Sequence, residues 1–421
     1  MGGLRLGAGW QSPAAMPRRW LAGIFAVSAL FAALVAVFSS DSVHRLWGTM
    51  AACGYGLALV AVAVWRERGA DTAVVVSFGG ALAVPLTWMA HKAFEQPEVA
   101  VVARSASTLI HHGTPYAGAV ALAATTDPNA YNPYLPVMAL FGLPRAVFGD
   151  SLLTDPRIWF GAVFLVVFWS ALRCGGARDP WRWSVLIAAS PFIAFELAVG
   201  GTDVPMVAFL CLGFAFLWQS RPVLPGLALG VAASMKATAW PAVLVAIALL
   251  AVRDGKRAVG VFTGTAVAVA AVFAGPFVVV DPKALVENTI KFPLGLAHVT
   301  SQASSPLLGH VIAGTGHVGH TIVVLLLALA GLAIAVSLVV RPPRAVPRAV
   351  LLLAGAMTLM FVLAPSTRFG YLIYPATLVL WLLAVAAGRT VREQAVTPGP
   401  DVPPASSRTR WRTSSVTRPA A

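Results

Sequence analysis

Charged side chains are scarce in this sequence. Asp, Glu, Lys and Arg make up only 11% of its 421 residues, whereas 58% of the residues are hydrophobic. Soluble globular domains carry roughly 25% charged residues and about 45–50% apolar ones, so the composition excludes that class. Runs of about 20 apolar residues recur along the chain, and each can cross roughly 30 Å of hydrocarbon. Because these runs are continuous rather than alternating, they predict membrane helices instead of a barrel.

Cysteine is rare, and several motifs of soluble enzymes are missing. Cys53, Cys174 and Cys211 lie in or beside apolar runs without the spacing of metal ligands, so we interpret each as a small buried hydrophobe. The sequence has no Walker-type phosphate loop, no GxSxG elbow and no HExxH helix. These absences argue against an ATP-driven pump and against direct use of a sugar nucleotide. We expect no metal site and no cofactor.

The apolar runs predict an all-α polytopic protein with about twelve crossings. A run at 135–148, broken by Pro144, is expected to be re-entrant or interfacial instead. Two short runs, 223–235 and 239–252, form one interrupted segment. The remaining runs lie near 20–39, 47–65, 72–90, 157–172, 183–199, 204–219, 258–280, 319–340, 348–364 and 371–387.

The net charge of +14 is distributed unevenly along the chain. With both termini on the cytoplasmic side, most Lys and Arg residues fall on inner connectors, as expected for a multi-pass protein of the cytoplasmic membrane. The basic excess is therefore topological, and we expect no nucleic-acid partner. We predict a cytoplasmic tail at 1–17, a membrane domain at 18–388, and a disordered basic tail at 389–421 near anionic membrane lipid. Two long loops, 91–156 and 281–318, would face outward.

Acidic side chains follow the third predicted span. Glu95 and Glu98 lie at a membrane boundary, where a carboxylate can act as general base on an acceptor hydroxyl. A solvated loop acid is the alternative for either residue. Glu98 is the preferred base because it opens a helix that would aim its side chain.

Residues 99–110 have helical spacing. Val99, Val102, Ala103, Ala106 and Ile110 share one apolar stripe, with Glu98, Arg104 and Ser105 off it. The pattern predicts an amphipathic helix in the membrane interface, ended by Gly113. Tyr116 would then lie at the headgroup level, where amphipathic rings are stable.

Four further charged residues cluster at outer helix ends. Asp203 is expected to cap the helix that follows it, to contact a ligand, or both. Glu196 lies within a span, where an ionisable group is a functional candidate. Lys236 interrupts two apolar runs and needs an anionic partner, either a lipid phosphate or one of those two acids. Arg368 suits bidentate phosphate recognition, so Lys236 and Arg368 together could clamp a phosphate.

Histidines gather around the second outer loop. The spacing of His298, His310, His317 and His320 does not predict a metal site. One of them could act in acid–base chemistry or bind sugar, although a surface histidine is the commoner role.

Six segments occur in an order that resembles a known family. They are Glu98 with LIHHGTPY, then AYNPYLP, GGTDVPMVAFL, GLALGVAASMKATAWP, SQASSPLLG and LAPSTRFGYLIYP. Over about residues 72–387 the chain resembles polytopic GT-C glycosyltransferases. Within these it is similar to glycosyltransferase family 87, the polyprenyl-phosphate-mannose-dependent mannosyltransferases of actinobacterial envelopes. Two departures stand out: Glu replaces the usual Asp, and Thr367, Arg368 and Phe369 replace histidines near the last outer turn.

The resemblance implies an activity and roles for particular residues. A sugar, mannose in this family, would pass with inversion from a polyprenyl-phosphate donor to a lipid or glycan acceptor at the outer face. Lys236 and Arg368 would hold the donor phosphate, and the base would be Glu98, with Glu95 and Asp203 as the other candidates. Contacts with acceptor or sugar would come from Tyr116, Tyr131, Glu196, His298, Gln302 and Tyr371.

A transporter or lipid-carrier translocase is the rival interpretation. Interrupted helices with polar residues at mid-membrane suit transport, and 223–252 is interrupted. The polar groups nevertheless gather at the predicted outer face, and we see no internal repeat, which favours an enzyme. A structural or regulatory membrane protein is a third possibility.

Overall fold

The computed structural model describes residues 13, 16–65, 69–219, 221–299 and 303–396. Within these residues the chain is helical, and the one extended pairing is an isolated parallel bridge between Ser304 and Thr367. The predicted all-α polytopic fold is confirmed. Gln302 lies outside the described residues.

Eight helical segments in the described ranges are long and apolar enough to cross a membrane. They are α1 (Arg18–Phe38), α2 (Ser42–Val64), the continuous α3–η3–α4 (Gly69–His91), α8 (Pro156–Gly175), α14 (Gly255–Val280), α17 (His317–Val340), α18 (Val346–Leu363) and Phe369–Arg389, which joins η9 (Phe369–Leu372) to α19 (Ile373–Val396). A ninth span is possible if α9 (Pro180–Ala188) and α10 (Pro191–Val199), bent by 62°, count as one.

The other three predicted crossings form shorter apolar helices. They are α11 (Asp203–Leu217), α12 (Val223–Ala233) and α13 (Trp240–Arg253), with η7 (Ala237–Ala239) in the break between the last two. The longest of these, α11, has 15 residues, which at about 1.5 Å per residue falls short of roughly 30 Å of hydrocarbon. Both ends of α11, Asp203 and Leu217, are buried, so a polar group at either end faces the protein interior.

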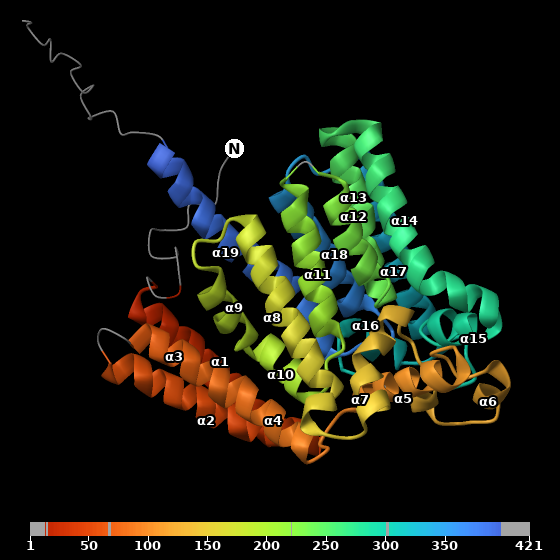
Figure 1. Ribbon diagram of the computed structural model, residues 1–421, viewed down its shortest axis with the longest axis horizontal. Coiled ribbons are helices and arrows are strands. Elements are labelled where there is room, and N and C mark those ends of the chain that lie inside the picture. The colour runs from red at the N-terminus through yellow and green to blue at the C-terminus, as the bar shows by residue number, and fades with distance from the viewer. Residues whose placement is uncertain (1–12, 14–15, 66–68, 220, 300–302, 397–421) are drawn as a thin grey trace, which may run out of the picture.

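Helix α11 lies at the centre of the bundle, between α8 and α12 in Figure 1, and also contacts α19. It is apolar on all sides and almost wholly buried, as expected for a helix surrounded by others. Gly213 allows the close approach of α12, because a Cβ there would overlap the side chain of Leu229. In contrast, α14 and α17 expose most of their apolar side chains, as lipid-facing helices do.

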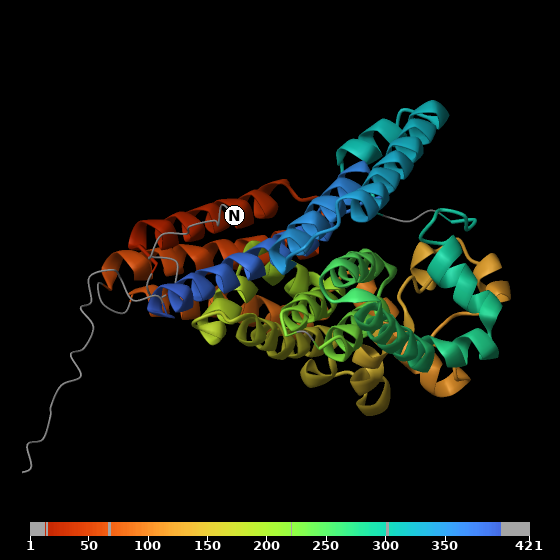
Figure 2. The same cartoon turned by 90° about the horizontal axis from the view of Figure 1, so that it is seen from above.

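The N-terminal hairpin α1–α2 packs on α3 and α4 along one side of the bundle (Figures 1 and 2). Gly54 and Gly80 touch through their backbones, and a Cβ on either would overlap the other. Tyr55 donates a hydrogen bond of 2.6 Å to the carbonyl of Ala189, which ties the hairpin to the α9–α10 bend. Cys211 is buried, but Cys53 is exposed on the hairpin, so the prediction that all three cysteines are buried is wrong.

Helix α5 (Pro97–His112) confirms the predicted amphipathic segment and ends at Gly113, whose φ of 70° is left-handed. The predicted stripe is only partly correct. Ser105 is buried and donates to the carbonyl of Val101, whereas Ile110 is 47% exposed. The buried face packs on η5 (Pro136–Gly142) and α7 (Leu143–Phe148), so contacts within the protein account for the apolar pattern.

We call the loops 91–156 and 281–318 the outer loops after their predicted orientation, and they fold together through short elements. Asn288 is fully buried: its side chain accepts from the backbone N–H of Asn132 at 2.8 Å and donates to the carbonyl of Ala117 at 3.1 Å. Tyr116 is also buried and donates to the carbonyl of Tyr134, so it packs inside the protein, and its place at the headgroup level stays a prediction. The elements are α6 (Ala119–Ala123), η4 (Pro128–Ala130), η6 (Leu152–Thr154), α15 (Pro282–Val286), η8 (Glu287–Lys291) and α16 (Leu308–Ala313).

Candidate active site

Glu98 lies in the first turn of α5 and pairs with Arg368, although 270 residues separate them in the chain. One carboxylate oxygen, Oε1, accepts from Nη1 of Arg368. The other, Oε2, is buried and has no hydrogen-bond partner in the described part of the chain. The carboxylate is thus oriented by its cation and keeps one oxygen with spare acceptor capacity.

Arg368 is held in place by backbone pairing with the second outer loop. The N–H of Thr367 donates to the carbonyl of Ala303 at 3.1 Å, and the N–H of Ser305 donates to the carbonyl of Thr367 at 2.9 Å. Thr367 is fully buried and donates its hydroxyl to the carbonyl of Phe361. The residues that replace the expected histidines therefore fix the backbone from which Arg368 extends.

Lys236 occupies the break between α12 and α13 and pairs with Asp203 at the start of α11. Its Nζ lies 2.6 Å from Oδ1 of Asp203, and the hydroxyl of Tyr374 donates to the same oxygen. The partner of Lys236, left open by the sequence, is Asp203. The capping prediction for Asp203 is wrong, because the cap residue of α11 is Thr202 and no side chain makes a capping hydrogen bond there.

Two tyrosine rings flank the Lys236 cation. Its Nζ lies 5.5 Å from the ring centre of Tyr134 and 5.1 Å from that of Tyr371. Aromatic faces attract a cation electrostatically at such distances. The rings therefore stabilise the charge of Lys236 in a region where water is scarce.

Glu196 joins these two ion pairs into one cluster. Its carboxylate lies against Gly370. A Cβ added at Gly370 would overlap Oε1 and the carboxylate carbon of Glu196. The charges of Asp203, Glu98, Arg368 and Lys236 all act on it. Three carboxylates and two cations, all singled out in the sequence, thus converge from α5, α10, α11, the break after α12, and the segment before η9. We call these five residues the charged cluster.

Glu95 lies in a different network. Its carboxylate is 3.6 Å from Arg145 and 3.7 Å from Arg157, and both arginines also pair with the fully buried Asp155. Arg157 donates to the carbonyls of Phe94 and Ala198, so it ties the start of α5 to the end of α10. Burial raises the pKa of Glu95 against the opposing effect of both arginines. The network holds the backbone around the charged cluster, which favours Glu98 over Glu95 as the base.

Tyr131 and His298 form a contact between the two outer loops. The Tyr131 hydroxyl lies 3.2 Å from Nδ1 of His298, and its ring stacks on Phe292 at 4.5 Å between centres. Nε2 of His298 lies 2.7 Å from the carbonyl oxygen of Thr125. These contacts join the loops to each other, and no described contact joins either residue to the charged cluster. Their predicted role in sugar or acceptor binding stays a prediction.

Sequence reasoning missed two tyrosines of the site. Tyr134 was not predicted as a site residue beyond its place in the motif AYNPYLP, yet its buried ring faces Lys236. Tyr374 was not singled out, although its hydroxyl links Asp203 to Thr238. Spacing could have identified Tyr374, because residues three apart share a helix face and Tyr371 was already a candidate.

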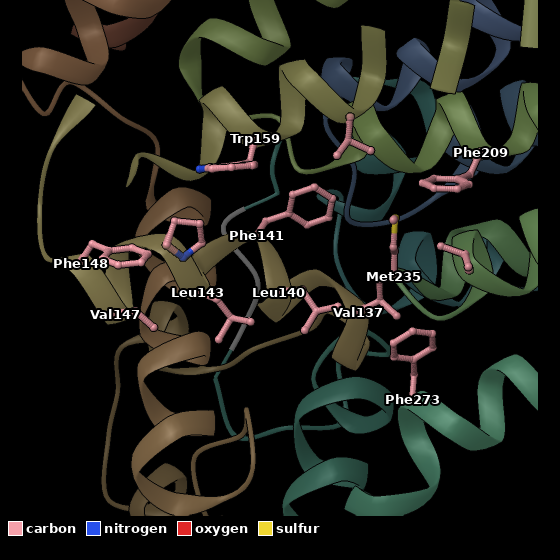
Figure 3. Close-up of a pocket in the computed structure, with 13 residues that line it drawn as sticks. Val137, Leu140, Phe141, Leu143, Val147, Phe148, Trp159, Phe209, Met235 and Phe273 are labelled. Carbon is pink, nitrogen blue, oxygen red and sulfur yellow. The ribbon is translucent and has the colours of Figure 1, made fainter. Parts of the chain in front are cut away.

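An apolar groove of about 530 Å³ lies next to the break that carries Lys236 (Figure 3). Met235, the residue before Lys236, forms part of its wall. The backbone of the facing wall is tied to the break, because the N–H of Leu135 donates to the carbonyl of Met235 at 2.9 Å. The wall consists of Val137, Leu140, Phe141, Leu143, Pro144, Val147, Phe148, Trp159, Val163, Phe209, Val231, Met235 and Phe273.

Comparison with known proteins decides the family. The family model described as glycosyltransferase family 87 matches residues 132–365. The chain belongs to glycosyltransferase family 87. The described residues contain eight helical segments long and apolar enough to cross a membrane, and the predicted family is confirmed. The matched region contains Glu196, Asp203 and Lys236, whereas Arg368 lies just after its end and Glu98 lies well before its start.

A solved structure and a search of curated proteins add little to the assignment of this chain to family 87. The crystal structure of ArnT from Cupriavidus metallidurans in the apo state is similar at 17% identity with a TM-score of 0.45, covering 78% of this chain and 62% of that chain. The family 87 chain thus spans less than two thirds of ArnT. No curated protein matches the sequence. Among the described residues, no group of three or more His, Cys, Asp or Glu side chains could hold a metal ion.

Proposed function

We propose that this enzyme transfers mannose from a polyprenyl-phosphate donor to a hydroxyl of a lipid or glycan acceptor, with inversion at the anomeric carbon. The observation that carries the proposal is the charged cluster, in which a carboxylate with one spare oxygen lies beside two cations. The reaction would take place at the outer face of the cytoplasmic membrane, with both termini inside. The distribution of Lys and Arg over the connectors supports this orientation.

The cations of the cluster suit a donor phosphate. Arg368 donates one guanidinium hydrogen bond to Glu98, and Lys236 donates one ammonium hydrogen bond to Asp203. Arginine has five N–H donors and lysine three, so both keep donors for phosphate oxygens. Charge builds up on the phosphate as the bond to the sugar breaks, and fixed cations stabilise that charge most in a site that excludes water.

Glu98 is the proposed base. The acceptor hydroxyl would donate to Oε2, the oxygen without a described partner. As the hydroxyl oxygen forms its bond to the anomeric carbon, the bond from that carbon to the phosphate oxygen breaks. The proton passes to Glu98, and polyprenyl phosphate leaves with the bonding electrons. One displacement of this kind inverts the anomeric configuration, and general-base catalysis contributes about 10²–10⁴-fold to a rate.

The apolar groove would take the first isoprenoid units of the donor lipid. It begins at Met235, beside the proposed phosphate-binding Lys236, and its wall is made of aliphatic and aromatic side chains (Figure 3). Apolar surface of this kind binds hydrocarbon without requiring directional contacts. A variant with a carboxylate in the wall, Phe273→Glu, should raise the KM for a long-chain donor more than for a donor with a short chain.

A transfer assay tests the proposal. Purified protein in nanodiscs is supplied with radiolabelled polyprenyl-phospho-mannose and with lipid or glycan acceptors, and labelled product is followed over time. We expect transfer in the wild type and its loss, by about 10² or more, in Glu98→Gln. The matched control is Glu287→Gln, a carboxylate on η8 that pairs with Lys291, which should keep its activity.

The same preparation separates the enzyme from the transporter. Absence of transfer together with solute or lipid flux in proteoliposomes would overturn the proposal. Full activity of Glu98→Gln would instead move the base to Glu95 or Asp203. Reaction of a cysteine at position 98 with a membrane-impermeant reagent added outside tests the orientation independently.

A further inference from the structure

We propose that His44, in the N-terminal hairpin, is a positioning residue for Glu98 and sets the acid limb of the pH–rate profile. This inference rests on the proposed function, because it assigns a further residue to the same site. It also gives the hairpin, which lies before the matched family region, a part in the chemistry.

His44 lies near the start of α2 and is held from both sides of its ring. Nδ1 is 3.2 Å from the hydroxyl of Ser39, in the turn before α2. Nε2 contacts the side-chain amide of Gln96. The ring also packs edge-on against Phe195, with 4.9 Å between ring centres. An imidazole held by three partners cannot turn freely, so its orientation is set by the fold.

Gln96 connects His44 to the proposed base. It is the cap residue of α5, two positions before Glu98, and its N–H donates to the carbonyl of Val199 at the end of α10. A neutral imidazole whose Nδ1–H donates to Ser39 can accept at Nε2 from the Gln96 amide. Protonation of Nε2 removes that acceptor and requires the amide to turn its oxygen to the ring. The protonation state of His44 therefore changes the contact that holds the first turn of α5.

The charges around His44 come from three elements. Asp41, the cap of α2, places Oδ2 3.6 Å from Nε2. Glu98 on α5 and Arg368 before η9 also act on the ring electrostatically, and the facing side chain from α10 is the neutral Phe195. A proton on His44 thus adds a positive charge next to the Glu98–Arg368 pair. This charge competes with Arg368 for Glu98, so transfer should slow as His44 becomes protonated.

The test is the pH dependence of kcat and of KM, measured between about pH 5 and 9 because histidine titrates in that range. In His44→Gln we expect the acid limb of kcat to move to lower pH. Above the limb we expect kcat to fall about tenfold, as for the loss of one orienting hydrogen bond, with KM changed less than twofold. The matched control is His91→Gln, an exposed histidine at the end of α4, which should retain the wild-type profile.

A second variant covers the case in which His44→Gln fails to fold. Asp41→Asn keeps the ring but removes the negative neighbour that stabilises a proton on it, so the acid limb should again move to lower pH. Wild-type profiles in both variants, with wild-type kcat, would overturn the inference while leaving the proposed function intact. Absence of transfer in the wild type would refute the proposed function itself. The two failures are therefore distinguishable in one set of measurements.

Discussion

Removal of the Lys236–Asp203 ion pair offers a quantitative test of how the charged cluster is stabilised. The pair is nearly buried, with 13% of the Lys236 side chain and 7% of the Asp203 side chain exposed. Removing one partner of a buried pair costs about 3–5 kcal/mol, because the remaining charge loses its compensation. Asn at position 203 still accepts hydrogen bonds from Lys236 and Tyr374, so we expect Asp203→Asn to cost about 2–3 kcal/mol.

The companion variants complete a double-mutant cycle. Lys236→Met leaves Asp203 charged, but Tyr374 still donates to it, so we expect a loss of about 3 kcal/mol. The double variant has no unpaired charge, and we expect it to be destabilised by only about 1–2 kcal/mol. The resulting coupling energy is about 3–5 kcal/mol, well above the error of additivity.

Unfolding in mixed micelles, followed by tryptophan fluorescence as the denaturing detergent is increased, measures all four free energies of unfolding. The matched control is the exposed pair of Lys291 with Glu287, where a double-mutant cycle should give a coupling of about 0.3–0.5 kcal/mol. Additive losses at positions 203 and 236, with a coupling below about 0.5 kcal/mol, would refute the buried pair. We also expect both single variants to lose transfer activity, since neither retains the phosphate-facing arrangement.

Three further predictions concern other parts of the structure. Gly370→Ala should lower kcat and should lower the free energy of unfolding by about 1–3 kcal/mol, because its Cβ would displace Glu196. Gly355→Ala, in open space, should leave the free energy of unfolding unchanged or raise it by about 0.5–1 kcal/mol. Thermal unfolding and transfer rates compare the two variants. Because the pKa of Glu95 is raised in the folded protein, the free energy of unfolding of the wild type should fall as the pH rises through that pKa. Glu95→Gln should flatten this pH dependence in melting curves taken from about pH 4 to 8. An equal pH dependence in the wild type and the variant would contradict the prediction. Asn288→Ala removes the buried link between the outer loops and should lower the free energy of unfolding by about 2–3 kcal/mol. Both loops should then be cleaved faster by protease than in the wild type. Equal cleavage rates in the variant and the wild type would refute the prediction.

The sequence predicted the class of fold and the members of the charged cluster because both depend on local composition. Membrane helices are recognisable from apolar length alone, and an ionisable residue at a span boundary stands out against an apolar background. The order of motifs identified family 87 as well. The pairing within the cluster was not predictable, because Glu98 and Arg368 are joined by tertiary packing of segments far apart in the chain.

The differences between the sequence predictions and the structure have physical causes of the same kind. The helical stripe of α5 was assigned to the membrane interface, but packing on η5 and α7 produces the same apolar spacing. Asp203 has the sequence context of a helix cap, yet its carboxylate accepts hydrogen bonds from Lys236 and Tyr374 instead. Tyr116 has the sequence context of an interface residue, yet its ring is buried and its hydroxyl donates to the carbonyl of Tyr134, because a ring with a hydroxyl suits both a headgroup layer and a buried site. In each case one local pattern is compatible with two environments, and only the fold distinguishes them.

The wall of the apolar groove is joined to the segment that carries Lys236 by main-chain hydrogen bonds. Leu135 donates to the carbonyl of Met235, and Val137 donates to that of Ser234 at 3.1 Å. Main-chain bonds do not depend on side-chain identity. Substitutions that widen or narrow the groove can therefore accumulate without displacing the lysine. If the groove takes the donor lipid as proposed, family members can diverge in the length or saturation of the isoprenoid they accept while the chemistry at the sugar stays the same.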